Sequence, residues 1–274
     1  MKPRLSRRGI GFALHHPRLA LLLASGSISY GEMLRVMVKN DVGLLRLRAG
    51  QVLGTSNFLK LSKKDMDRAI DEITPAKHES SWRLLNRWHS FLYAIVRAYS
   101  PSLVVETGVL YGHSSAAILA ALEDNGTGQL TSIDLCREEH QNITVGRQHV
   151  QVGLSSNEFS VGCAVPVDLR SRWNLVLGNS LELLPKILGE TRHVSIFIHD
   201  SLHTYDHMMA EFSLGYNALE LGELLMSDDI GYNLAWQDFC ELKNEDWGTL
   251  SKGLSDQIPS KRQHSLRMTV TQML

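Results

Sequence analysis

The sequence has few cysteines and almost no net charge. Its three cysteines, Cys136, Cys163 and Cys240, are scattered, and none forms a C-x-x-C pair or a metal-ligand spacing. This usage predicts a reducing, cytoplasmic setting without a disulfide framework. A formal net charge of −1 over 274 residues gives no broad electrostatic basis for binding nucleic acid or an anionic membrane.

The sequence also lacks a hydrophobic run long enough to span a membrane. The apolar stretch at residues 19–24 is far shorter than the roughly 20 residues that a span requires. His15, His16 and Arg18 lie directly before it, which is unlike the core of a secretory signal. We therefore expect an amphipathic helix that packs on the domain or on a partner subunit.

A third missing feature is the G-x-G-x-x-G pattern of dinucleotide-binding turns. The apolar run at residues 103–105 ends in Glu106 and opens into a turn whose glycines, Gly108 and Gly112, are four positions apart. In a dinucleotide site the glycine spacing lets a pyrophosphate sit on backbone N–H groups. Glu106 would place a negative charge where that phosphate lies. An acid at this position suits a cationic ligand, such as the amino group of a methionine moiety.

The sequence does contain a regular alternation of strand and helix patterns. Strands are expected at residues 103–106, 130–135, 174–178, 194–198, 223–227 and, as a final edge strand, 266–274. Helices are expected at residues 62–73, 81–99, 181–188 (capped by Ser180), 204–219 and 233–242. We predict an α/β fold: a Rossmann-like, doubly wound and mostly parallel sheet of seven strands with an N-terminal helical extension.

The length suits one α/β domain with an added segment. We expect residues 1–76 to form the helical extension, as a lid or as the interface of a homo-oligomer. Residues 77–274 would form the sheet domain.

Several polar side chains follow the ends of the first three strands. Ser114 and Ser115 open a helix, where free N–H groups and hydroxyls can hold a carboxylate. Asp134 can accept both hydroxyls of a ribose, and Asn179 can pair with an adenine edge. Either residue could instead cap a turn or a helix. The predicted cofactor-binding residues are Glu106, Thr107, Gly108, Tyr111, Gly112, Ser114, Ser115, Asp134, Asn179, Ser180 and Asp200.

Acidic residues also follow the fourth and fifth strands. Asp200 ends one, and Asp228 with Asp229 ends the other. Three carboxylates at one edge repel one another unless a cation neutralises them, and all-oxygen ligands suit Mg²⁺. His203 could then take the proton of a substrate hydroxyl near neutral pH. The alternative is that the acids form a solvated turn and His203 a helix cap.

Three motifs carry a family resemblance over about residues 82–245. They are the segments 104–115, 197–205 and 224–230, which resemble class I S-adenosylmethionine-dependent methyltransferases, namely the macrolide-sugar and, more distantly, the catechol O-methyltransferases. The resemblance implies that Asp200, Asp228 and Asp229 hold Mg²⁺ and that His203 is the base. The chain departs from the catechol-type pattern in placing His199 directly after the strand, where those enzymes have their acid. It also has two aspartates where they have Asp-Asn.

The sequence thus predicts a methyltransferase that uses S-adenosylmethionine, assisted by Mg²⁺, to methylate a hydroxyl of a small molecule such as a sugar or another natural product, as in natural-product biosynthesis. His203 and Asp200 are the predicted catalytic residues. Three alternatives stay open: a transferase of the same fold that needs no metal, a nicotinamide-dependent oxidoreductase, and a non-catalytic family member that acts as a binding subunit.

Overall fold

The structure is a computed structural model. It describes residues 17–53, 58–74, 84–135, 143–145, 148–150, 159–191, 193–245, 247–249 and 269–271. His15, His16, Cys136 and most of the predicted edge strand at 266–274 lie outside these residues.

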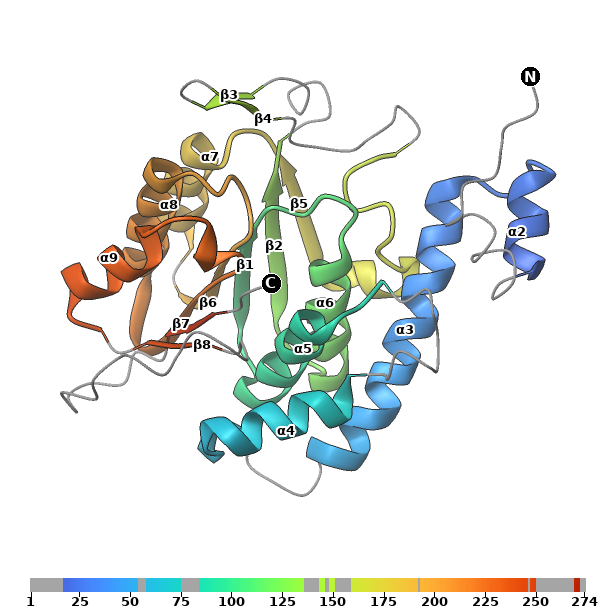
Figure 1. Ribbon diagram of the computed structural model, residues 1–274, viewed down its shortest axis with the longest axis horizontal. Helices are drawn as coiled ribbons and strands as arrows, with labels where there is room; N and C mark the ends of the chain where they lie inside the picture. Colours follow the sequence, from blue (N-terminus) through green and yellow to red (C-terminus); the bar gives the residue numbers. More distant parts are fainter. Residues whose placement is uncertain are drawn as a thin grey trace.

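A twisted parallel sheet forms the centre of the molecule (Figure 1). Its five main strands are β1 (Leu103–Thr107), β2 (Gln129–Asp134), β5 (Trp173–Leu177), β6 (Val194–His199) and β7 (Leu219–Ser227). They lie in the order β5-β2-β1-β6-β7. Successive strands are added on one side of β1 up to β5 and then on its other side from β6 onward, so the strand order switches between β1 and β6. This arrangement confirms the doubly wound α/β class.

Shorter strands complete the sheet and one separate ribbon. β9 (Thr269–Thr271) pairs in parallel with β7, and β8 (Trp247–Thr249) pairs in parallel with β9. The sheet therefore reaches the predicted seven strands only when these two three-residue strands are counted. β3 (Ile143–Val145) and β4 (Gln148–Val150) form an antiparallel pair apart from the sheet.

Helices cover both faces of the sheet (Figure 1). On one side lie α3 (Tyr30–Val52), α4 (Lys63–Ile73), α5 (Arg87–Tyr99) and α6 (His113–Asn125). On the other lie α7 (Ser180–Glu190), α8 (Tyr205–Ala218) and α9 (Ala235–Lys243). Short 3-10 turns occur at Phe58–Lys60 (η2), Val167–Arg172 (η4) and Ile230–Tyr232 (η5).

The alternation of side chains along β6 decides which helices its residues meet. Ile196 and Ile198 belong to the apolar core beneath α5 and α6, whereas Phe197 belongs to the core beneath α8 and α9. Side chains two apart share a face of a strand, so His199 lies on the α8 side. Gly215 lets α8 approach closely there, because a Cβ at this position would lie 2.5 Å from the Phe197 ring.

The short helix α2 (Pro17–Ala24) occupies the apolar stretch near the start of the sequence. Leu19 and Leu23 pack against the core while Leu21 is exposed, in agreement with an amphipathic helix on the domain. Among the described residues, no helix is both long and apolar enough to cross a membrane.

Two predicted helix starts are wrong. α5 begins at Arg87 and not at residue 81, because Asn86 caps it: the Asn86 side chain accepts the Trp88 N–H, and its backbone N–H donates to His89 Nδ1. Residues 84–86 precede this cap, and residues 81–83 lie outside the described part. α7 is capped by Asn179, whose Oδ1 accepts the Leu181 N–H, and not by Ser180.

Candidate functional site

The carboxyl ends of the parallel strands bring most of the predicted polar residues to one edge of the sheet. Thr107 at the end of β1 is in register with His199 of β6, which is in register with Ser227 of β7. Burial raises the pKa of Asp200 well above its usual value, and the charges of Asp228, Glu106, Asp229 and Asp134 raise it further. The predicted acids of the four strands therefore lie near one another.

The glycine turn after β1 packs against the turn after β6. Gly108 has a φ of +85°, and a Cβ there would lie 1.9 Å from the Asp200 carbonyl oxygen. Gly112 has a φ of +90°, and a Cβ there would lie 2.5 Å from a methyl carbon of Val165. Both glycines are required by contacts within the chain, since other residues neither adopt this backbone readily nor fit the space.

Asp134 supports the same turn. Its Oδ2 accepts the backbone N–H groups of Val109 at 3.0 Å and Leu110 at 2.7 Å, and its Oδ1 accepts the N–H of Leu135 at 2.7 Å. Leu110 is held with a φ of +51°, which is uncommon for a residue with a side chain. The carboxylate at the end of β2 thus caps a turn, which was the alternative to binding a ribose.

Glu106 is fully buried beneath the turn. Its Oε2 accepts hydrogen bonds from the hydroxyls of Ser115 at 2.6 Å and Ser132 at 2.7 Å. Burial raises the pKa of Glu106, while bonds from Ser114, Ser115 and Ser132 oppose that shift. Oε1 has no hydrogen-bond partner among the described residues. The Ser115 hydroxyl, expected to hold a ligand carboxylate, is instead occupied in supporting Glu106.

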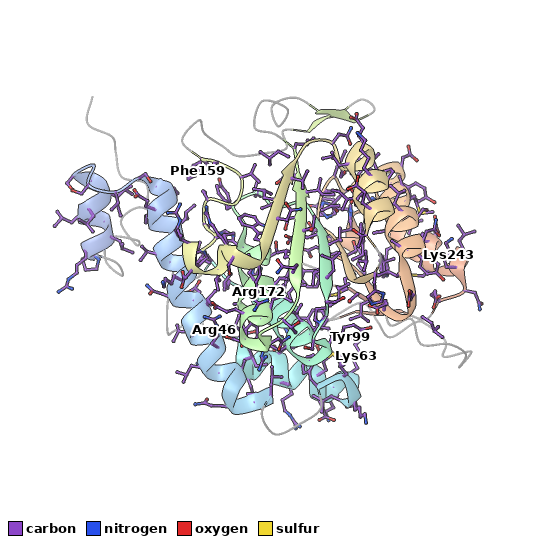
Figure 2. All side chains as sticks on the ribbon, turned by 180° about the vertical axis from the view of Figure 1, so that it is seen from behind. Arg46, Lys63, Tyr99, Phe159, Arg172 and Lys243 are labelled. Atoms are coloured by element: carbon purple, nitrogen blue, oxygen red, sulfur yellow. The ribbon has the colours of Figure 1, made fainter. Side chains whose placement is uncertain are left out.

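Aromatic rings line the start of α6. The Tyr111 ring lies 5.9 Å from that of His113 and 5.2 Å edge-on from that of Phe159. Phe159 lies beside α3 (Figure 2), where its ring meets that of Tyr30 at 5.2 Å. Burial lowers the pKa of His113 to about 4, so its imidazole is neutral at pH 7. The N-terminal helices therefore reach the glycine turn.

The acidic pair after β7 is held by backbone contacts. The Asp228 N–H donates to the His199 carbonyl, and the Asp229 N–H donates to Asp228 Oδ1, both at 2.9 Å. Burial and the charge of Asp229 raise the pKa of Asp228 to about 7. Asp229 Oδ1 is buried without a partner among the described residues. Within the same residues, no group of three or more histidine, cysteine, aspartate or glutamate side chains is placed to hold a metal ion.

His203 lies next to these acids. Its ring stacks on Tyr232 at 5.5 Å, and its carbonyl accepts the side-chain N–H of Asn233 at 3.2 Å. Burial is the main reason that the pKa of His203 falls to about 4. Its Nε2 is buried and has no partner in the described part of the chain. His203 is therefore a neutral imidazole at pH 7, with a nitrogen available to a ligand.

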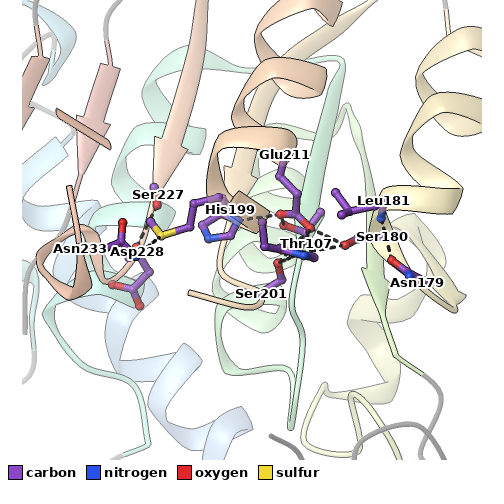
Figure 3. Close-up of polar contacts among 12 residues, drawn as sticks. Thr107, Asn179, Ser180, Leu181, His199, Ser201, Glu211, Ser227, Asp228 and Asn233 are labelled. Carbon is purple, nitrogen blue, oxygen red and sulfur yellow. Dashed lines mark hydrogen bonds and ion pairs between the residues drawn. The ribbon is translucent and has the colours of Figure 1, made fainter. Parts of the chain in front are cut away.

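Sequence reasoning missed a buried polar network centred on Glu211 of α8 (Figure 3). This carboxylate is fully buried and accepts from Thr107 Oγ1 at 2.5 Å and from Ser201 Oγ at 2.9 Å, as well as from Ser180 Oγ. It also bonds His199 Nδ1 at 2.6 Å and His207 Nε2 at 2.8 Å. Burial alone would raise the pKa of Glu211, but the bonds from the two histidines outweigh burial and lower it. Thr107 and Ser180, predicted to bind cofactor, donate to this network.

A signal for the network exists in the sequence. Glu211 lies between Met208 and Phe212 on the apolar stripe of α8, and His207 precedes it by four residues, on the same side of the helix. A charged residue on a buried stripe needs partners, which predicts a polar cluster at this position.

Part of the chain is similar to a known protein family. Residues 105–230 match the family model described as a methyltransferase domain. The match spans β1 to the end of β7 and includes the predicted site residues from Glu106 to Asp229. This stretch, a little under half of the chain, is therefore similar to a methyltransferase domain.

Solved structures with a similar fold share little sequence with this chain. An O-methyltransferase from Bacillus cereus, in complex with SAH, is 16% identical, covers 75% of this chain and 87% of its own, and has a TM-score of 0.42. The O-methyltransferase TomG from Streptomyces achromogenes, in complex with SAM, is 14% identical over 63% and 76%, with a TM-score of 0.42. Scores below 0.5 carry no information on the reaction of this chain. No curated protein matches it.

Proposed function

We propose that this chain transfers a methyl group from S-adenosylmethionine to a hydroxyl oxygen of a small molecule. The observation that carries the proposal is Glu106, a buried carboxylate at the end of β1 with one oxygen unpartnered among the described residues. Inside a methyltransferase domain, this charge suits the ammonium group of the methionine moiety and opposes the phosphates of a dinucleotide.

The rest of the cofactor would lie along the same edge of the sheet. Gly108 and Gly112 bring the backbone of the turn beneath it, with Tyr111 and Ser114 beside the amino-acid end. Asp134 would accept the ribose hydroxyls with lone pairs left over from capping the turn. Asn179, which is exposed at the start of α7, would meet the adenine edge.

The methyl transfer would take place beside β6 and β7. The acceptor oxygen attacks the methyl carbon as the carbon–sulfur bond breaks, so S-adenosylhomocysteine leaves and the hydroxyl proton must be removed. The unpartnered Nε2 of His203 supports its role as the proton acceptor, since the lowered pKa leaves the imidazole without a second proton at pH 7, while the same shift makes it a weak base. Tyr232, stacked on His203, would line the acceptor side.

A hard cation fits the donor chemistry of Asp200, Asp228 and Asp229. Burial is the main cause of their raised pKa values, and neighbouring carboxylates raise the pKa of Asp200 and Asp228 further. These three residues would hold Mg²⁺, although they do not form a ready ligand set and their side chains would have to converge. A bound ion would supply positive charge next to the acceptor oxygen.

Calorimetry with two ligands tests the cofactor assignment. S-adenosylhomocysteine carries the ammonium group, whereas 5′-methylthioadenosine lacks the amino-acid end. In E106Q the amide oxygen can keep the serine bonds while the charge is lost, so we expect about tenfold weaker binding of S-adenosylhomocysteine and little change for methylthioadenosine. E223Q, which alters a glutamate in the middle of β7 and near the start of β6, is the matched control. Binding of NAD⁺ in place of S-adenosylhomocysteine would favour the oxidoreductase alternative.

Turnover separates the remaining alternatives. Transfer of tritiated methyl from S-adenosylmethionine to a panel of sugars, phenols and catechols would be followed with Mg²⁺ and with EDTA. Transfer that survives EDTA would assign a metal-independent enzyme. Cofactor binding without transfer to any compound would favour a binding subunit.

A further inference from the structure

One buried carboxylate, that of Glu211, connects elements on both the cofactor side and the acceptor side of the proposed site. Glu211 is bound by Thr107 from β1, His199 from β6, Ser180 from α7, Ser201 from the turn after β6 and His207 from α8. Neighbouring donors lower the pKa of Glu211, so it is ionised. An ionised carboxylate has no proton to give, so each partner must donate to it.

This requirement fixes the protonation of one histidine nitrogen. His199 Nδ1 lies 2.6 Å from Glu211 Oε2 and must carry the proton of that bond. With Nδ1 engaged by Glu211, Nε2 is the ring nitrogen that the network leaves open to another partner. It is fully buried and has no hydrogen-bond partner among the described residues. A buried nitrogen of this kind is rare in a native protein and calls for a ligand, a water or a strain explanation.

The surroundings of that nitrogen point to the acceptor side of the site. Figure 3 shows His199 between Glu211 and the turn formed by Ser227 and Asp228. The ring of His203 lies 5.2 Å from that of His199, and the Asp228 N–H donates to the His199 carbonyl at 2.9 Å. His203 Nε2 and Asp229 Oδ1 are also buried and unpartnered in the described chain. Three polar atoms without partners therefore lie around the ends of β6 and β7.

We propose that Glu211 is a positioning residue that holds His199 with its proton on Nδ1 and presents the bare Nε2 to the hydroxyl of the methyl acceptor. The proposal rests on the proposed function and adds a second histidine to it. The hydroxyl donates its hydrogen bond to His199 Nε2 in the bound state, which turns an oxygen lone pair toward the methyl group. As the new carbon–oxygen bond forms and the carbon–sulfur bond breaks, the proton moves along this hydrogen bond to His199 Nε2, which makes His199 an alternative to His203 as the proton acceptor.

Nitrogen NMR of the full chain with labelled histidine tests the positioning directly. The sequence has 12 histidines, and the signals lost in H199Q assign His199. We expect wild-type His199 to carry its proton on Nδ1. In E211Q the amide NH₂ group would face hydroxyl and N–H groups that donate to the carboxylate in the wild type. We therefore expect E211Q to populate the form of His199 that is protonated on Nε2. E211D keeps a carboxylate and should retain the wild-type pattern. A proton on Nε2 in the wild type, or the same pattern in E211Q, would overturn the proposal.

A second histidine–glutamate pair provides the control. His193 Nε2 lies 2.9 Å from Glu223 at the opposite end of β6 and β7. E223Q removes the charge of that pair, and we expect it to leave the His199 signals and turnover unchanged.

Binding and turnover distinguish positioning from packing. For the best acceptor in the tritium assay, we expect E211Q and H199Q each to lower kcat by about tenfold or more, with the Kd for S-adenosylhomocysteine within roughly threefold of wild type. The double variant should be no slower than H199Q, because both changes remove one unit. A parallel loss of cofactor binding and turnover in E211Q would assign Glu211 to packing alone. If E211Q does not fold, the wild-type spectrum and H199Q decide.

The two proposals fail in different ways. Wild-type protein that does not bind S-adenosylhomocysteine would overturn the proposed function, whereas the position of the His199 proton is read from the spectrum without any cofactor.

Discussion

The carboxylate of Asp134 accepts the backbone N–H of Leu110 at 2.7 Å, so the end of β2 fixes the turn that follows β1. The same oxygen, Oδ2, also accepts the backbone N–H of Val109 at 3.0 Å. An acid at this position therefore shapes the turn after β1, where we propose that the cofactor binds, before any ligand arrives. A variant without the Asp134 carboxylate could therefore lose ligand binding for two reasons: the turn loses its support, and the ribose hydroxyls lose their proposed acceptor.

The first prediction separates those two roles. D134A leaves the N–H groups of Val109 and Leu110 without their acceptor, and we expect it to lower the free energy of unfolding by about 1–3 kcal/mol. It should also weaken S-adenosylhomocysteine binding more than it weakens binding of a 2′,3′-dideoxy analogue, which lacks the ribose hydroxyls. Equal losses for the two ligands in calorimetry would limit Asp134 to supporting the turn.

A second prediction concerns the contact between the turns after β1 and β6. G108A places a Cβ 1.9 Å from the Asp200 carbonyl oxygen, whereas G126A, also at a positive φ, meets nothing within 4 Å. The left-handed backbone alone costs roughly 1–2 kcal/mol, which we expect for G126A. G108A should cost clearly more in urea unfolding and should abolish cofactor binding. Equal stability of the two variants would show that the turns can separate freely.

A third prediction uses the raised pKa of Asp228. A carboxyl group whose pKa is about 7 in the folded protein and near 3.8 when unfolded stabilises the fold at low pH, and that stability is lost as pH rises through 7. In EDTA, D228N should therefore be more stable than wild type at pH 8, by about 2–4 kcal/mol, with little difference at pH 4. Thermal unfolding across this range measures the effect. Added Mg²⁺ should close the gap at pH 8 if the ion binds there.

A fourth prediction concerns Asn179, which caps α7. N179A removes the acceptor of the Leu181 N–H and should cost about 1 kcal/mol of stability, whereas N179D keeps the cap. If the amide also meets the adenine edge, both variants should bind S-adenosylhomocysteine roughly three- to tenfold more weakly. N179D with wild-type affinity would leave Asn179 as a cap only.

Features that depend on local sequence were predictable. The strand-turn-helix around Glu106, the strand ending at Asp134 and the cap of α4 at Ser62 follow from apolar runs, glycines and capping residues within a few positions. The convergence of the acids followed from one topological rule, since carboxyl ends of parallel strands share an edge.

Features that depend on contacts across the fold were not. Gly108 was expected to approach a ligand, but its nearest neighbour is the Asp200 backbone, 92 positions away (200 − 108). Ser115 and Ser180 follow strand ends, as ligand-binding serines do. In the structure their hydroxyls instead donate to the buried carboxylates of Glu106 and Glu211. Which partner a polar group chooses is set by packing between distant segments, and a single sequence does not report it.

The N-terminal helices share one apolar core with the sheet domain. Met37 and Leu45 of α3 belong to the same cluster as Leu119 of α6 and Ile198 of β6. Arg46 of α3 bonds Asp124 at the end of α6 at 3.0 Å (Figure 2). In a protein shortened to residues 77–274, the apolar side chains of α5 and α6 that now pack against α3 and α4 would be exposed to solvent. A minimal enzyme for expression or design must therefore keep the first helices, whatever their part in binding.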